Sequence, residues 1–151
     1  MMNISISIGG DHAGFSLKEI IKEYLTNKGV LLIDRGPFTN HSVDYPDFVH
    51  PVCQDVLEGR AELAILICGS GNGVAITANK YRGIRCGLCW IPELAALARR
   101  HNNANALALP ARFIDQSTAI LILDNFLENS FEGGRHKRRV DKITPDVHFL
   151  C

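Results

Sequence analysis

Residues 63–80 read LAILICGSGNGVAITANK, and the interpretation of the whole chain starts from this stretch. It opens with an uninterrupted apolar run, Leu63 to Cys68, which is typical of a parallel strand buried on both faces. A glycine-rich turn follows, and a helical pattern begins near Val74. A strand, a glycine turn and a helix start aim backbone N–H groups at one point, where an anion or a developing oxyanion is stabilised. We expect Cys68, the last residue of the strand, to face that point.

Strand and helix patterns alternate along the rest of the chain. Apolar runs predict further strands over residues 3–8, 30–34, 84–89 and 106–109. Apolar periodicity and helix-start residues predict helices over residues 17–25, 49–57, 92–101, 115–128 and 135–143. This alternation predicts a doubly wound α/β fold with a mainly parallel sheet. Ligands bind such sheets beyond the carboxyl ends of the strands, where Cys68 and the pair Asp11-His12 are expected.

Length and composition favour one ordered domain over residues 1–151, with a C-terminal helix and tail from about residue 135. Hydrophobic residues make up 46% and charged residues 21%, which argues against disorder. The predicted helix over residues 115–128 has apolar side chains on most of its circumference, and not only on one face. Deep burial or a subunit interface would explain that pattern.

The charge pattern and the apolar runs exclude several classes of function. The chain has 16 basic residues (Lys and Arg) and 16 acidic residues (Asp and Glu), so its net charge is +0. We therefore expect no extended basic surface of the kind that binds nucleic acid. The longest apolar runs are too short to cross a bilayer, and the N-terminus lacks the features of a signal peptide. We therefore expect a cytoplasmic protein without a nucleic-acid or membrane partner.

The 5 cysteines do not form a recognisable disulfide or metal framework. Their odd number in a cytosolic chain argues against structural disulfides. Cys86 and Cys89 have the spacing of a metal or redox pair, but residues three apart on a strand point to opposite faces. We expect them to be core cysteines, and we expect no metal site there.

Two groups at the predicted sheet edge could carry chemistry. The thiolate of Cys68 should be favoured beside helix N-terminal N–H groups, which lowers a thiol pKa, and Ser70 adds a hydroxyl in the same turn. A buried strand-end cysteine without a role is the alternative. Asp11 and His12 follow the first strand, although Asp11 could equally cap a helix beside a bystander histidine.

Two further groups lie later in the chain. His101 follows the apolar stripe of its helix, so its side chain should point inward, either as a functional group or as a satisfied core histidine. Arg135 and Arg139 are four residues apart on a predicted helix, where two guanidinium groups could clamp a phosphate or face solvent. The glycine turn is not G-x-G-x-x-G, and Lys80 comes too late for a Walker A loop, so a nucleotide-binding module is only weakly supported.

Six motifs in order along the chain resemble those of the ribose-5-phosphate isomerase type B family, which also contains the galactose-6-phosphate isomerase subunits. The likeness covers about residues 3–144. The motifs are Asp11-His12-Ala13-Gly14, Asp44-Tyr45-Pro46, Cys68-Gly69-Ser70-Gly71-Asn72-Gly73, Ala78-Asn79-Lys80, Arg100-His101-Asn102-Asn103 and Glu132-Gly133-Gly134-Arg135-His136.

The resemblance implies a Rossmann-like three-layer α/β/α sandwich with a five-stranded sheet, assembled as a homodimer or a dimer of dimers. It also implies interconversion of ribose 5-phosphate and ribulose 5-phosphate, a reaction of the pentose phosphate pathway, without metal or cofactor. Cys68 matches the base of the cysteine-type members. Other members carry a glutamate at the position of Val74, which is apolar here.

Roles for the other site residues follow from the same resemblance. Ser70 and the loop residues would hold the enediolate oxygens, the latter being Gly69, Gly71, Asn72 and Gly73. His101, with Asp11 nearby, would open the furanose ring, and Tyr45 and Asn102 would line the sugar site. The phosphate would be bound by His12, Arg112, Arg135 and Arg139. His101, Asn102 and Arg112 are expected to come from the neighbouring subunit.

Two rival functions remain open at this point. A six-carbon phosphosugar, galactose 6-phosphate or allose 6-phosphate, could be the substrate. However, Cys68, His101 and the arginine pair occur together in this chain, which favours a self-sufficient homodimer. Cys68 could instead be the nucleophile of a Cys-His-Asp hydrolase.

Overall fold

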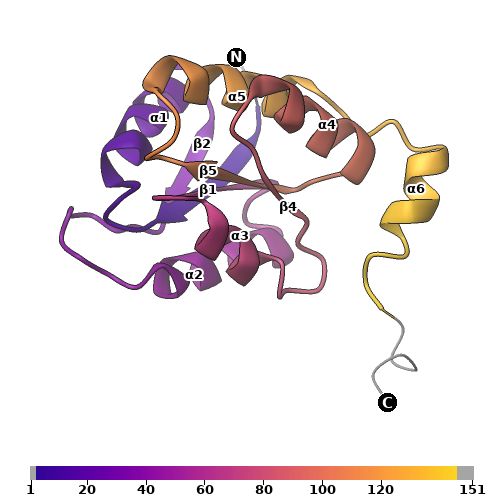
Figure 1. Ribbon diagram of the computed structural model, residues 1–151, viewed down its shortest axis with the longest axis horizontal. Coiled ribbons are helices and arrows are strands. Elements are labelled where there is room, and N and C mark those ends of the chain that lie inside the picture. Colours follow the sequence, from indigo (N-terminus) through magenta and orange to yellow (C-terminus); the bar gives the residue numbers. More distant parts are fainter. Residues whose placement is uncertain (1–2, 146–151) are drawn as a thin grey trace.

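A five-stranded parallel sheet forms the centre of the computed structural model, which describes residues 3–145 (Figure 1). The strand order is β2-β1-β3-β5-β4, and every pairing is parallel. The strands are β1 (Ser5–Gly10), β2 (Leu31–Asp34), β3 (Leu63–Cys68), β4 (Cys86–Leu88) and β5 (Ala106–Pro110). All six residues of the central strand β3 are buried, as its unbroken apolar run predicts.

Helices cover both faces of the sheet, so the predicted three-layer α/β/α fold is confirmed (Figure 1). One face packs against α1 (Phe15–Asn27), α4 (Pro92–Asn102) and α5 (Gln116–Glu128). The other packs against α2 (Tyr45–Leu57) and α3 (Asn72–Ala78). The short helix α6 (Arg135–Val140) stands beside α4, away from the sheet (Figure 1).

Alternation along β3 divides its side chains between the two layers. Ile65 and Ile67 join the apolar cluster under α1, α4 and α5, whereas Leu66 and Cys68 join the cluster under α2 and α3. Fully burying one such aliphatic side chain contributes about 1.5–3 kcal/mol. The sulfur that the sequence singles out therefore ends a strand whose position is fixed from both sides.

Some boundaries differ from the predicted ones. The first strand begins and ends two residues later than expected, because its register against β3 runs as far as Gly10 opposite Ile67. β4 is limited to three residues, since it is an edge strand with a single neighbour. The last helix ends at Val140 rather than residue 143, and most of the predicted tail lies outside the described residues.

The prediction that Cys86 and Cys89 point to opposite faces of the sheet is confirmed. Cys86 packs on the α2 and α3 side of the sheet, while Cys89 lies in the cluster on the opposite side. Burial raises the pKa of Cys89 to about 12, so its thiol is protonated at neutral pH.

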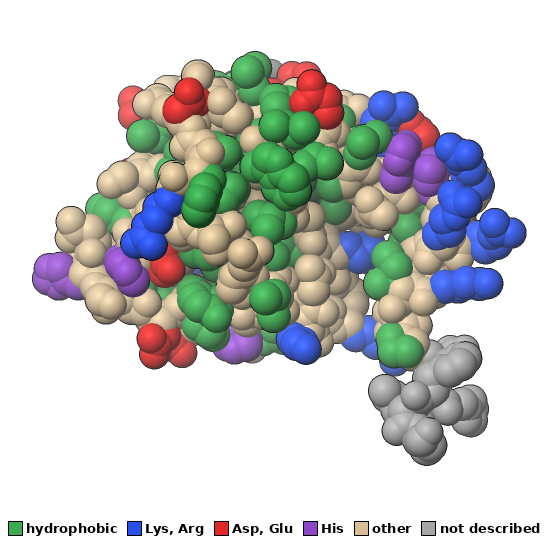
Figure 2. All heavy atoms as spheres, viewed as in Figure 1, with side chains coloured by type: hydrophobic (Ala, Val, Ile, Leu, Met, Phe, Trp, Pro, Cys, Tyr) green, Lys and Arg blue, Asp and Glu red, His purple; other side chains and the backbone are tan. Residues whose placement is uncertain are grey.

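Helix α5 is deeply buried on one side, and it also exposes apolar side chains. Its N-cap is Asp115, whose carboxylate accepts the N–H of Thr118 at 2.7 Å, as expected. Phe126 is fully buried, whereas Leu121 is 54% exposed. Apolar side chains also gather over α4 and α5 on the face shown in Figure 2. Among the described residues, no helix has the length and apolar character that crossing a bilayer requires.

Candidate active site

Ten of the predicted site residues lie at the carboxyl edge of the sheet. We call them the carboxyl-edge cluster: Asp11, His12, Tyr45, Cys68, Gly69, Ser70, Gly71, Asn72, Gly73 and Arg112. Parallel pairing brings them together, because β1, β3 and β5 are neighbours and end at the same edge. Gly10 is in register with Ile67, and Cys68 is in register with Pro110. Residues that follow these strands therefore surround the end of β3.

The glycine loop is held between two side chains. Gly71 has φ +76°, a left-handed conformation that suits glycine, and it caps α3. A Cβ on Gly73 would lie 2.5 Å from Cζ of Tyr45, so the tyrosine ring rests on the backbone there. At the other end of the loop, a Cβ on Gly69 would lie 3.1 Å from Nη1 of Arg112. The loop thus needs glycine at position 71 for its turn and at position 73 for the close approach of the Tyr45 ring.

Arg112 differs from what the family resemblance implies. Its backbone N–H donates to the carbonyl of Gly69 at 3.0 Å, and its guanidinium lies over the same residue. The pairing of β5 with β3 explains this position. Arg112 therefore lies at the carboxyl edge of its own chain, and no second subunit is needed to bring it there.

Hydrogen bonds fix the orientation of Asp11 and His12. One oxygen of Asp11 accepts the N–H groups of Ala13 at 2.9 Å and Gly14 at 3.2 Å. Asp11 therefore closes the turn before α1 and is not the helix cap considered for it, because the N-cap of α1 is Gly14. Nδ1 of His12 accepts the N–H of Val43 at 3.2 Å. Since Nδ1 is the acceptor, the neutral ring carries its proton on Nε2, which remains available as a donor.

The remaining predicted residues lie at the opposite, amino edge. Helix α4 starts after the carboxyl end of β4 and runs back to Asn102, before β5 begins. His101 and Asn102 therefore end up far from Cys68 along the strand direction. Helix α6 packs on α4 and brings Arg135 and Arg139 to the same side. We call this group the amino-edge cluster: His101, Asn102, Glu132, Arg135, His136 and Arg139.

The prediction that His101 points into the core is wrong. Its side chain is 34% exposed, and its ring stacks on that of His136 with centroids 4.0 Å apart and planes at 9°. The last turn of α4 is covered by α6 rather than by the sheet, so the apolar stripe of α4 does not continue as core at this residue.

Glu132 links this histidine pair to Arg100. Its Oε1 accepts Nε of Arg100 at 2.5 Å, and its Oε2 lies 3.8 Å from Nε2 of His101 and 3.6 Å from Nε2 of His136. The hydrogen bond from Arg100 lowers the pKa of Glu132. Desolvation, with the charges of His101 and Arg135 next in effect, lowers the pKa of His136. Basic side chains also gather over α6 in Figure 2.

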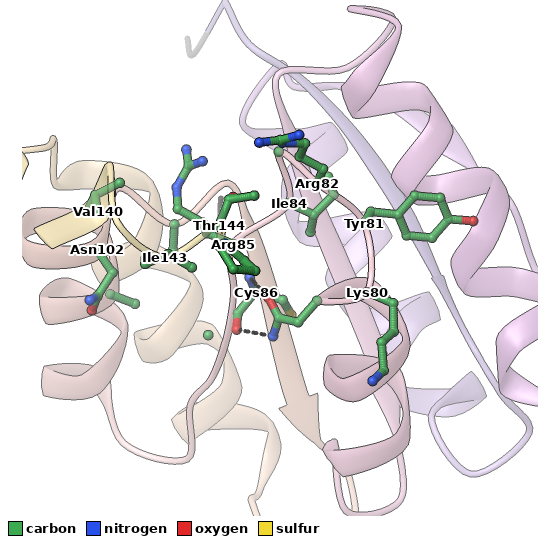
Figure 3. A pocket seen from close by; sticks show the side chains of 16 residues that line it. Lys80, Tyr81, Arg82, Ile84, Arg85, Cys86, Asn102, Val140, Ile143 and Thr144 are labelled. Carbon is green, nitrogen blue, oxygen red and sulfur yellow. Dashed lines mark hydrogen bonds between the residues drawn. The ribbon is translucent and has the colours of Figure 1, made fainter. Parts of the chain in front are cut away.

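A cavity of about 500 Å³ lies next to the amino-edge cluster (Figure 3). Asn102, Val140 and Ile143 form one side of it, Lys80 and Arg82 form part of the other, and Arg85 lies between them. The amide of Asn79, from the Ala78-Asn79-Lys80 motif, exchanges two hydrogen bonds with the backbone of Cys86 at 2.8 and 3.0 Å. This part of the motif therefore secures the edge strand.

The sequence profile of the Ribose/Galactose Isomerase family matches residues 6–143. Ribose-5-phosphate isomerase B of Escherichia coli is 42% identical over 139 residues, which are 92% of this chain and 93% of that protein. The chain belongs to the ribose/galactose isomerase family. It is accordingly an aldose–ketose isomerase.

Solved structures of ribose/galactose isomerase family members have the same fold. A ribose 5-phosphate isomerase from Thermotoga maritima has a TM-score of 0.93 and 50% identity, covering 94% of this chain and 98% of its own. Ribose-5-phosphate isomerase B from Mycoplasma genitalium, solved with bound ribulose 5-phosphate, has a TM-score of 0.89 and 46% identity, covering 95% of each chain.

Two residues in this ribose/galactose isomerase were given no role by sequence reasoning. Glu132 and His136 stand at the two ends of the motif Glu132-Gly133-Gly134-Arg135-His136, and the sequence patterns assign a role to neither of them. Their four-residue spacing was the available signal, because such spacing can bring side chains together. The contact with His101 could not be inferred, since it depends on how α6 packs against α4.

Proposed function

We propose that this isomerase interconverts D-ribose 5-phosphate and D-ribulose 5-phosphate as part of the pentose phosphate pathway in the cytoplasm. The observation that carries the proposal is the Mycoplasma genitalium relative, 46% identical over 95% of each chain, with ribulose 5-phosphate bound. Relatives named for ribose 5-phosphate favour this five-carbon substrate over galactose 6-phosphate or allose 6-phosphate. We further propose that the chain forms one domain.

In this proposal the carboxyl-edge cluster carries out the proton transfer. With the sugar open as an aldehyde, the Cys68 thiolate removes the proton from C2 and forms an enediolate. A hydroxyl proton passes from O2 to O1, and the thiol returns its proton to C1 to give the ketose. Ser70 and the backbone N–H groups of the loop stabilise the negative oxygens. This position at the end of β3 supports the assignment of Cys68 as base.

Ring opening, sugar binding and phosphate binding combine residues of both clusters. His101 opens the furanose ring, acting together with Asp11, and Asn102 and Tyr45 line the sugar site. Arg135 and Arg139 bind the phosphate with His12 and Arg112, and this remote binding energy positions the reacting carbons.

These roles require two subunits. Cys68 and His101 lie at opposite edges of the sheet in one chain, so neither cluster is complete alone. We propose a homodimer, or a dimer of such dimers, in which the carboxyl-edge cluster of each chain meets the amino-edge cluster of its partner. A twofold axis then generates two equal sites. The exposed Leu121 and its apolar neighbours on α4 and α5 offer surface for such an assembly.

Turnover of ribose 5-phosphate in heavy water tests the proposal. We expect deuterium at C1 of ribulose 5-phosphate, and at C2 of ribose 5-phosphate in the reverse direction. Turnover without uptake would exclude an exchangeable thiol proton. Ribose 5-phosphate, allose 6-phosphate and galactose 6-phosphate assayed side by side should rank in that order, and a preference for a six-carbon sugar would contradict the substrate assignment.

A further inference from the structure

The amino-edge cluster contains a group of three metal-ligating side chains, of which only His101 has a proposed role in the isomerase reaction. Nε2 of His101, Nε2 of His136 and Oε2 of Glu132 all lie within 4.8 Å of one another. They come from α4, from α6 and from the segment that joins α5 to α6. The backbone N–H of Glu132 donates to the carbonyl of Arg100 at 3.0 Å, which fixes that segment against α4.

These distances are close to those of a zinc site. A tetrahedral Zn²⁺ holds N and O ligands at about 2.0–2.1 Å, so its ligand atoms lie roughly 3.3 Å apart. The two Nε2–Oε2 distances are 3.6 and 3.8 Å. Parallel imidazoles have parallel lone pairs, so each ring must rotate for the lone pairs to converge. The side chain of His101 is 34% exposed and has room for that rotation, and the exposed Glu132 can follow it. The ring of His136 is buried, so it can turn only if the neighbouring side chains of α4 and α6 adjust.

The charges around the group determine what else the ion would bind. Arg100 occupies Oε1 of Glu132, which leaves Oε2 for the metal. Arg135 and Arg139 on α6 add positive charge, which weakens the affinity for any cation. The same charge favours an anion in the fourth coordination position, which two histidines and one carboxylate leave open.

We propose that His101, Glu132 and His136 form a Zn²⁺ site whose occupation inhibits the enzyme. The metal takes the Nε2 lone pair of His101, so this imidazole can no longer transfer a proton to or from the sugar ring. The inhibition rests on the role proposed above for His101, whereas the binding of zinc does not.

Calorimetric titration with zinc chloride, and absorption spectroscopy with Co²⁺ as a substitute, test the site without any turnover assay. We expect one ion per chain and the visible bands of tetrahedral cobalt. His136→Phe keeps a flat ring against His101 but removes one ligand, so it should weaken zinc binding at least about tenfold. Glu132→Gln, which removes the carboxylate charge, should weaken it as well. His50→Phe is the matched control on the exposed face of α2 and should bind like the wild type.

Cys68 must be separated from this site, because thiolates also bind zinc. Cys68→Ala should keep the zinc affinity of the wild type. The ribose 5-phosphate turnover of His136→Phe, measured relative to its own rate without zinc, should resist a zinc concentration that inhibits the wild type. Unchanged zinc affinity in His136→Phe, or loss of binding in Cys68→Ala, would overturn the proposal. If ribose 5-phosphate proves not to be the substrate, the binding measurements still decide whether the site exists.

Discussion

Cys68 differs from the other buried cysteines in what surrounds its sulfur. It is only 4% exposed, but it is the last residue of its strand, and the glycine loop begins immediately after it. Cys53 lies inside α2, where burial raises the pKa of its thiol to about 11. At neutral pH Cys53 is therefore a protonated core residue, and it is a suitable control for the role of Cys68.

Replacing Cys68 by alanine should abolish the proton transfer without preventing binding of the substrate. Loss of a general base costs on the order of 10³ in kcat, whereas the phosphate contacts do not involve the sulfur. Steady-state kinetics and calorimetric binding of ribose 5-phosphate measure the two effects. Cys53→Ala should lower the free energy of unfolding but leave kcat within about twofold. Normal turnover in Cys68→Ala would show that another group is the base.

Gly73→Ala tests the contact between the loop and Tyr45. The added methyl group would lie 2.5 Å from the tyrosine ring, and the ring must move or the loop must shift. Overpacking of this kind costs about 1–3 kcal/mol, measured as the free energy of unfolding in urea. In a Tyr45→Ala background the same change should cost far less, because the obstructing ring is gone. Equal costs in both backgrounds would mean that the ring does not rest on Gly73.

At the scale of elements, a buried carboxylate joins α2 to the sheet. Asp55 of α2 is fully buried and accepts the hydroxyl of Ser7 in β1 at 2.7 Å. Arg35, just after β2, donates to both of its oxygens at 2.6 and 2.8 Å, and Arg60 adds a bond of 2.7 Å. These bonds, led by that of Arg35, lower the pKa of Asp55 well below its ordinary range.

The lowered pKa of Asp55 predicts how stability depends on pH. The carboxylate stabilises the fold fully above the ordinary pKa of an aspartate, about 4, and loses this contribution as the pH falls toward the lower folded-state value. At pH 7, Asp55→Asn should lower the free energy of unfolding by about 2–4 kcal/mol, because two arginines lose their charged partner. The difference from the wild type should shrink steadily below about pH 4.

Urea unfolding of both proteins at several pH values measures this effect. Asp47→Asn, in the exposed first turn of the same helix, is the control and should cost less than about 1 kcal/mol at any pH. A difference for Asp55→Asn that stays constant between pH 7 and pH 3 would mean that folding does not lower the pKa of Asp55.

Sequence patterns correctly predicted those helices and strands whose type is determined by how their side chains are buried. The apolar run Leu63 to Cys68 predicts a strand covered on both faces, and β3 is such a strand. Asp115 correctly predicts the start of α5, because it is the N-cap of that helix. His101 shows where such reasoning stops. Periodicity places it on the inner stripe of α4, but whether the sheet or another helix covers the final turn depends on packing between distant segments.

At the scale of the whole molecule, the order of the motifs along the chain indicates the family, but it does not show which residues lie close together in the folded chain. The motifs around Cys68 and His101 are read together along the sequence, yet the parallel topology places them at opposite edges of the sheet. The carboxyl-edge group could be predicted, because strand ends of a parallel sheet share an edge. Arg112 was assigned to the neighbouring subunit, and only the pairing of β5 with β3 showed where it lies.

A shared site predicts that two inactive variants restore each other. Cys68→Ala and His101→Ala should each lack turnover, but in a mixed dimer one site combines both intact residues and the other combines both changes. Random assortment of equal amounts makes half of the dimers mixed, so refolding the two variants together should give about a quarter of the wild-type activity per chain.

A mixture of wild-type chains with chains that carry both changes is the control for a rise in activity caused only by better folding. A chain that carries both changes inactivates both sites of any mixed dimer. Equal amounts of this chain and the wild type should therefore reduce the activity per wild-type chain to about one half. Gel filtration and subunit exchange of labelled chains verify that mixed dimers form. If they form while the first mixture stays inactive and the second keeps full activity, Cys68 and His101 must act within one chain, and the separation of the two edges would have to close by a large movement of α4 and α6.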